Sequence, residues 1–174
     1  IIKRLIGKII QDKTPKDRDI PEEYFEFAKK LNPSDLILTF NYDTILENVF
    51  KILDISYRLF PLRYSSVGVS GNTIDNSKDE VILIKLHGSI DWFNKSHYNE
   101  RVKLSEASVV NYEPKNTIFQ SDSNFKTVQI VDGPRNQDDP LKNIYRIKEV
   151  ESFYSSEYPS ETPFLLSPSY SKIL

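Results

Sequence analysis

Hydrophobic and polar residues alternate along the first half of the chain with the spacing of helices and short strands. Apolar residues at positions 1, 2, 5, 6, 9 and 10 predict an amphipathic helix over residues 1–11. Pro21, followed by two glutamates, predicts the start of a second helix. The short apolar runs at residues 36–40 and 81–86 predict two strands. An unbroken apolar run is typical of a strand that is buried on both faces, as in a parallel sheet.

A helical pattern over residues 44–53 follows the first of these strands directly, and strand followed by helix is half of a βαβ unit. Thr44 and Glu47 have capping-box spacing, and Asp43 is an alternative cap for the same helix. Residues 55–60 predict a further short strand. These elements predict an α/β fold with a parallel sheet flanked by helices.

The rest of the chain has a weaker pattern. Residues 63–80 are polar and rich in Gly, Ser and Asn, which favours a loop. Residues 94–143 mix polar segments with short β-prone pieces such as SVVNY and KTVQIV, and residues 144–154 predict a short helix. The final apolar piece, TPFLLSPSYSKIL, is bracketed by prolines. We therefore expect a less regular C-terminal part.

Composition indicates one soluble globular domain spanning residues 1–174. The formal net charge of −2 gives no overall attraction to nucleic acid or to an anionic membrane, and no apolar run approaches the length of a membrane span. The chain has no cysteine, which excludes disulfides, thiolate nucleophiles and cysteine-based zinc sites and fits a cytoplasmic protein. It also has no methionine, even at position 1, so we expect a fragment of a longer protein.

Two polar residues able to do chemistry stand where the two apolar strands end. Asn41 follows the first strand and His87 follows the second. Ligands of parallel sheets bind outside the carboxyl ends of the strands, and neighbouring strands lie about 5 Å apart. A histidine titrates near neutral pH, so His87 is a candidate base toward a hydroxyl group. Gly88 beside it allows a tight backbone path and the close approach of a ligand.

Each of these residues also has a simpler interpretation. Asn41 or Asp43 alone is more often a helix cap, and a lone histidine is more often structural than catalytic. Asp91 is a candidate turn cap, and Trp92 is more typical of a core than of a stacking surface. His97, in a polar segment, is expected to be exposed. The pairing of two polar strand ends is what favours the functional interpretation.

Other catalytic motifs are absent from the sequence. It contains no Walker A loop, no G-x-G-x-x-G, no H-E-x-x-H and no G-x-S-x-G. A carboxylate-based metal hydrolase using Asp43, His87 and Asp91 is a weaker alternative, because the chain has only two histidines. We therefore predict no metal site.

The segments TFNYDTILE and IKLHGSIDW together resemble the sirtuin superfamily, and most closely the sirtuin-like domains of bacterial anti-phage proteins. Sirtuins carry a T-Q-N-I-D segment after a strand and a later H-G pair, which residues 39–43 and His87-Gly88 match. The bacterial domains carry N-Y-D followed by K-L-H-G-S, as residues 41–43 and 85–89 do here. AbiH-type abortive-infection proteins share a related F-N-Y pattern. The resemblance covers residues 34–93 and extends weakly to 174.

This resemblance implies a Rossmann-like cleft that binds NAD+ and cleavage of the bond between nicotinamide and ribose. It implies that Asn41 positions the ribose and an attacking water, and that His87 acts as the base. It implies that Asp43 holds the ribose or its loop. The remaining residues implied to contact the dinucleotide are Thr39, Phe40, Gly88 and Ser89.

Two departures from the family pattern refine this expectation. Sirtuin deacylases carry a four-cysteine zinc module, so a chain without cysteine favours NAD+ hydrolysis over deacylation and implies no zinc. The Gly-rich phosphate-binding loop of the family precedes the N-Y-D segment, but residues 1–35 contain no such loop. We expect that loop upstream of residue 1, and we expect the fragment alone to be inactive.

The resemblance also implies a biological setting. It implies an NAD+ hydrolase of bacterial anti-phage defence that acts by NAD depletion, as a homo-oligomer or together with a partner effector or sensor domain. No membrane or direct nucleic-acid partner is expected. The alternative is a non-catalytic module of the same fold that senses NAD or ADP-ribose, and binding without turnover would identify it.

Overall fold

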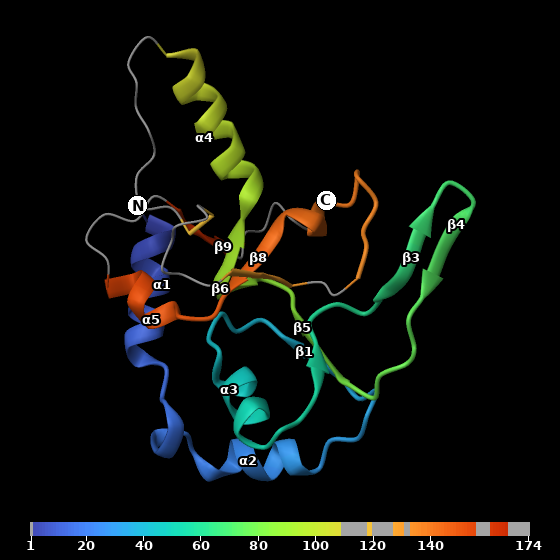
Figure 1. Cartoon of the computed structure of the whole chain (residues 1–174). Coiled ribbons are helices and arrows are strands. Elements are labelled where there is room, and N and C mark those ends of the chain that lie inside the picture. The colour runs from blue at the N-terminus through green and yellow to red at the C-terminus, as the bar shows by residue number, and fades with distance from the viewer. Residues whose placement is uncertain (1, 109–117, 120–126, 131–132, 156–160, 167–174) are drawn as a thin grey trace, which may run out of the picture.

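A parallel three-stranded sheet is formed by the apolar runs of the N-terminal half. The computed structural model describes residues 2–108, 118–119, 127–130, 133–155 and 161–166. Its parallel sheet has the order β1-β5-β2, with β1 Leu36–Thr39, β5 Val81–Lys85 and β2 Tyr57–Arg58. Thr39 is aligned with Lys85 in the register of β1 and β5. These two strands are neighbours, so their C-terminal ends meet at one edge of the sheet (Figure 1).

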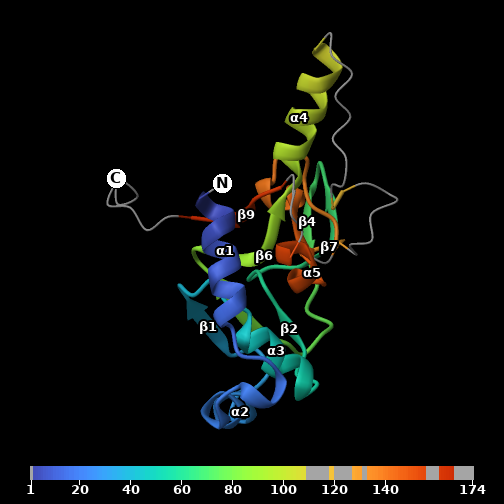
Figure 2. The ribbon, with the colours of Figure 1, turned by 90° about the vertical axis from the view of Figure 1, so that its left-hand side faces the viewer.

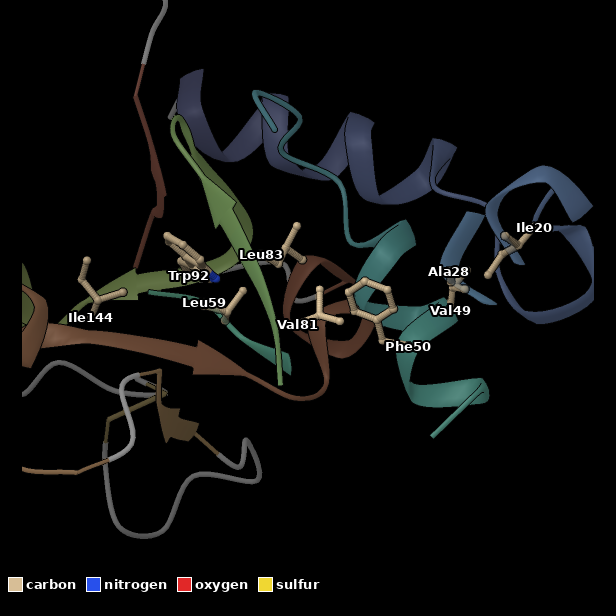
Figure 3. Close-up of a cluster of buried hydrophobic side chains, with 9 residues drawn as sticks. All are labelled: Ile20, Ala28, Val49, Phe50, Leu59, Val81, Leu83, Trp92 and Ile144. Atoms are coloured by element: carbon tan, nitrogen blue, oxygen red, sulfur yellow. The ribbon is translucent and has the colours of Figure 1, made fainter. Parts of the chain in front are cut away.

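Helices α2 (Glu22–Lys29) and α3 (Ile45–Ile52) pack against one face of this sheet. The core between them contains Phe50 of α3 and Leu83 of β5, both fully buried, and Figure 3 shows these side chains together with Trp92. The predicted α/β fold with a parallel sheet flanked by helices is confirmed. The parallel sheet is small, with three strands, and its strand β2 contributes only two residues.

The opposite face of β1 is open in the described part of the chain. Leu36 and Leu38 are 55% and 56% exposed, whereas Ile37 between them is half-buried against the core. The prediction that residues 36–40 form a strand buried on both faces is therefore wrong. The open face continues onto β5 through the half-buried Ile82 and Ile84.

A second sheet is antiparallel and has the order β7-β8-β6-β9, with β6 Gly88–Asn94 at its centre. Its other strands are β7 Thr127–Gln129, β8 Ile144–Ile147 and β9 Pro163–Leu165. Because β6 starts at Gly88, Leu86 and His87 form the whole connection between the two sheets. Helices α1 (Ile2–Lys13) and α5 (Val150–Ser155) contact each other, and α1 runs along β6 and β9 (Figure 2).

The structure differs from three other expectations drawn from the sequence. Residues 63–80, predicted as a loop, contain a hairpin of β3 Tyr64–Gly68 and β4 Gly71–Ile74. Residues 95–107 form helix α4 (Lys95–Ala107), which carries the exposed His97. The predicted helix at 144–154 is a strand, β8, followed by the one-turn helix α5. Most of the SVVNY piece and residues 167–174 lie outside the described residues.

None of the helices in the described ranges combines the length and the apolar character that a membrane span requires. The described residues also include two short 3-10 helices, Asp17–Asp19 and Pro140–Asn143.

Candidate active site

Two short turns lie side by side at the C-terminal edge of β1 and β5. We call residues 41–43 the N-Y-D turn and residues 87–89 the H-G-S turn. The amide of Leu86 donates to the carbonyl of Thr39 at 3.0 Å, which continues the strand pairing beyond β5. The amide of Ile90 donates to the carbonyl of Tyr42, also at 3.0 Å. Backbone hydrogen bonds therefore join the two chain segments just before the turns and again between Tyr42 and the residue that follows the H-G-S turn.

His87 packs against the two aromatic residues that flank Asn41. Its ring centroid lies 5.0 Å from that of Phe40 in an edge-on arrangement, and 6.0 Å from that of Tyr42. Asn41 itself is exposed, and its backbone amide donates to Thr39 Oγ1 at 3.1 Å. His87 is half-buried. The structure thus brings the two predicted polar strand ends to the same edge.

Asp43 caps helix α3. Its Oδ1 accepts a hydrogen bond of 3.1 Å from the amide of Ile45, the first residue of the helix. Thr44 makes no side-chain capping bond, and the buried Glu47 carboxylate accepts from Lys85 instead. Of the two alternatives for the cap, Asp43 is therefore the one that the structure contains. This bond commits one of its carboxylate oxygens to the helix.

Gly88 allows the strand β9 to approach closely. Its φ of +85° is in the left-handed region, and an added Cβ would lie 2.0 Å from the carbonyl oxygen of Phe164. The sequence predicted that Gly88 admits a ligand, but the space beside it is filled by this backbone. Ser89 next to it is fully buried. Neither residue presents exposed surface to a dinucleotide in this structure.

Tyr42 anchors the N-Y-D turn to the segment that follows β9. Its hydroxyl donates to the carbonyl of Leu166 at 2.6 Å, and the amide of Leu166 donates to the carbonyl of His87 at 2.8 Å. Burial raises the pKa of the Tyr42 hydroxyl. Leu166 therefore contacts both turns, and the neutral hydroxyl of Tyr42 is a hydrogen-bond donor in this contact.

A buried charged network lies behind the turns. Lys85 pairs with Glu47 at 2.8 Å, and Asp91 pairs with Arg146 at 2.6 Å. Burial by itself raises the pKa of Asp91, but the charges of Arg146 and Lys85 outweigh burial and hold that pKa below its usual range. Arg146 also donates to the hydroxyl of Tyr57. Asp91 is thus an ionised core residue and not a turn cap.

Sequence reasoning did not identify Lys85 and Glu47 as members of this network. A signal was available, since Lys85 is the only charged residue within an otherwise apolar run. A charged residue in a strand that is otherwise buried must have a buried partner. The partner Glu47 lies 38 positions away, on a helix where glutamate is common, so the pattern alone did not reveal it.

Asp91 was the third residue of the alternative metal site. Its carboxylate is directed to Arg146, on the side of β6 that packs toward β8. Within the described ranges, no three His, Asp or Glu side chains gather in a way that suits a metal ion. The edge instead presents the exposed side chains of Asn41 and Phe40 and the half-buried ring of His87. Such groups can bind sugar hydroxyls, accept a proton and cover an apolar ring face.

The family model of the SIR2-like domain matches residues 35–169. This span contains both turns, all three strands of the parallel sheet and all four strands of the antiparallel sheet. Searches among curated proteins and among solved structures find no match. Proteins with a SIR2-like domain are in general NAD-dependent enzymes. Because the matched span covers most of the chain, the chain belongs to the SIR2-like domain family.

Proposed function

We propose that the N-Y-D turn and His87 bind the nicotinamide–ribose part of NAD+ and that the intact protein hydrolyses the bond between nicotinamide and ribose. One observation carries this proposal: the ring of His87 packs against both aromatic neighbours of the exposed Asn41. This packing supports a shared site for the two groups that the chemistry requires, a side-chain amide and a base. Membership in a family of NAD-dependent enzymes supplies the substrate class.

The reaction needs one base and no acid. The bond between ribose C1′ and the pyridinium nitrogen breaks, and nicotinamide leaves as a neutral molecule with the bonding electron pair. The oxygen of a water molecule bonds to C1′, and its proton passes to His87. The transition state resembles an oxocarbenium ion, as in glycoside hydrolysis. The products are ADP-ribose, nicotinamide and a proton.

The edge residues suit the sugar end of the substrate. In this proposal the side-chain amide of Asn41 binds a ribose hydroxyl and orients the water, and His87 receives the proton of that water. The exposed ring of Phe40 supplies an apolar surface for the ribose or the nicotinamide ring. Thr39 supports the N-Y-D turn because its hydroxyl oxygen accepts a hydrogen bond from the backbone amide of Asn41. Asp43 fixes the start of α3, which keeps the N-Y-D turn in place.

We further assign the activity to bacterial anti-phage defence, in which NAD depletion in the cytoplasm arrests the infected cell. The sequence resemblance to AbiH-related and other anti-phage sirtuin-like domains supports this assignment. The absence of cysteine from the chain favours hydrolysis over zinc-dependent deacylation. In this setting the protein acts as a homo-oligomer or through an attached sensor domain. The assignment is tested by infecting bacteria that express the intact protein with phage and measuring their NAD level during infection. An unchanged NAD level would reject the assignment.

The catalytic assignment is tested by nicotinamide release from NAD+ in the intact protein. Asn41→Ala and His87→Ala should each abolish turnover. The matched controls are Asn72→Ala on β4 and His97→Ala on α4, which change the same residue types at exposed positions on other elements. Turnover retained in both Asn41 and His87 variants would reject the assignment. Binding of NAD+ or ADP-ribose without turnover in the wild type would instead identify a sensing module.

A further inference from the structure

Lys85 places a positive charge in the protein interior directly behind the two turns. It is the last residue of β5, two positions before His87, and its side chain is only 1% exposed. An ammonium group that loses its hydration must find hydrogen-bond acceptors in the protein. The identity of those acceptors therefore defines what Lys85 does.

The three N–H bonds of the ammonium meet three acceptors from three separate segments. Glu47 Oε1 on α3 lies 2.8 Å from Nζ, and Ser89 Oγ in the H-G-S turn also lies 2.8 Å away. The third acceptor is the backbone carbonyl of Asp43 in the N-Y-D turn. A lysine ammonium has three donors, so all of them are used. The ammonium is thus a single point of contact between α3 and both turns.

Ser89 extends this contact to Tyr42. A hydroxyl has one proton to donate, and because Lys85 supplies the proton in its bond with Ser89, the Ser89 proton is free to serve another acceptor. The carbonyl of Tyr42 lies 3.3 Å from Ser89 Oγ, and the carboxylate of Asp91 is the other acceptor that this hydroxyl can serve. The same carbonyl accepts the amide of Ile90 at 3.0 Å. Lys85 therefore binds the carbonyl of Asp43 directly and orients the Ser89 hydroxyl, which lies beside the carbonyl of Tyr42.

We propose that Lys85 is a positioning residue that fixes the N-Y-D turn relative to the H-G-S turn, and so fixes Asn41 relative to His87. The inference rests on the proposed NAD+ hydrolysis for its kinetic consequence only. Lys85 does not touch the substrate, because its side chain is buried and every donor is committed to the protein.

A purely structural role would have a different signature. Glu47 is also almost wholly buried, with 2% of its side chain exposed, so Lys85 could serve only to neutralise it. The variant Lys85→Met removes the charge and leaves Glu47 unpaired. The double variant Lys85→Met/Glu47→Met removes both charges at similar volume, and such replacements of a buried ion pair often restore stability. It does not restore a donor for Asp43 or for Ser89.

The experiment compares wild type, the single variant and the double variant in the intact protein. The melting temperature should fall in Lys85→Met and recover in the double variant. Hydrogen exchange of the Ile90 backbone amide should be at least about tenfold faster in the double variant than in the wild type. The Ile82 amide, at the other end of β5, should exchange at the wild-type rate in the same variant. With wild-type turnover established, kcat should stay about 100-fold low with KM changed less than about threefold.

The two hypotheses fail in different ways. If the double variant recovers both its melting temperature and wild-type Ile90 exchange, Lys85 only neutralises Glu47 and the positioning role is rejected. If the wild type consumes no NAD+, the proposed function is rejected, and the Ile90 exchange alone then decides whether Lys85 holds the turns together. Recovered kcat in the double variant would overturn the proposal even if exchange stayed fast.

Discussion

Asp91 and Arg146 form an ion pair between adjacent strands of the antiparallel sheet, with 2.6 Å between Asp91 Oδ2 and Arg146 Nε. Asp91 is 1% exposed, whereas Arg146 is 29% exposed. Arg146 also donates to the hydroxyl of Tyr57 on β2, which belongs to the parallel sheet. One guanidinium therefore links the two sheets, and its carboxylate partner cannot reach water.

Removing the buried partner should destabilise the fold. Asp91→Ala leaves Arg146 without its carboxylate, and breaking a buried pair in this way costs about 3–5 kcal/mol. Because Arg146 is partly exposed and keeps Tyr57, we expect a loss near the lower value, about 3 kcal/mol, in the free energy of unfolding measured with urea. Asp12→Ala, which removes the exposed pair with Lys8, is the matched control and should cost less than about 1 kcal/mol. Equal losses in the two variants would contradict the prediction.

The same carboxylate should make stability depend on acid pH. Its pKa lies lower in the folded protein than in the unfolded chain, because the charges of Arg146 and Lys85 outweigh burial. The folded state therefore binds fewer protons at this site. Its contribution is present in full above the unfolded value of about 3.9 and is lost as the pH falls through the folded pKa.

Asp91→Asn, which cannot titrate, should show a flatter loss of unfolding free energy than the wild type as the pH falls below about 4. Urea unfolding at each pH measures this difference. Parallel curves for the two proteins over that range would mean that Asp91 does not contribute to acid unfolding.

Gly88 should be intolerant of any side chain. An alanine Cβ there would lie 2.0 Å from the carbonyl oxygen of Phe164, on a backbone with φ of +85°. We expect Gly88→Ala to lower the free energy of unfolding by at least about 2 kcal/mol, from left-handed strain plus displacement of β9. Gly71→Ala is the control, because Gly71 also has positive φ but no heavy atom within 4 Å of the added Cβ. It should cost less than Gly88→Ala, and the reverse order would show that β9 adapts.

The parallel sheet was predictable because its strands are apolar enough to stand out in the sequence. The run at 81–86 forms β5, and the run at 36–40 forms β1. Strand β6 was missed because it is buried along nearly its whole length, yet it contains Ser89 and Asp91. Such polar residues look like surface residues until their partners are known. For Asp91 the partner is 55 positions away, on β8.

The hairpin β3–β4 was missed for the opposite reason. Most of its residues are exposed on both faces, so no alternation of apolar and polar residues marks it as a strand pair. At the candidate site, the placement of Asn41 and His87 at one edge followed from the strand ends alone. The buried support from Lys85 and Glu47 did not, because the energy of an ion pair depends on a contact between segments that no local pattern describes.

The open face of β1 should promote self-association. Leu36, Leu38 and Phe40 are exposed on the same side of a strand that has a free edge in the described part of the chain. An apolar edge strand without a charge or a proline is prone to pair with another chain. Leu38→Lys should therefore lower the weight-average mass measured by sedimentation over a series of concentrations. Val69→Lys, at the exposed tip of the hairpin, is the control and should leave the mass unchanged. A mass unaffected by Leu38→Lys, or lowered equally by both variants, would show that this face is not where copies of the chain associate.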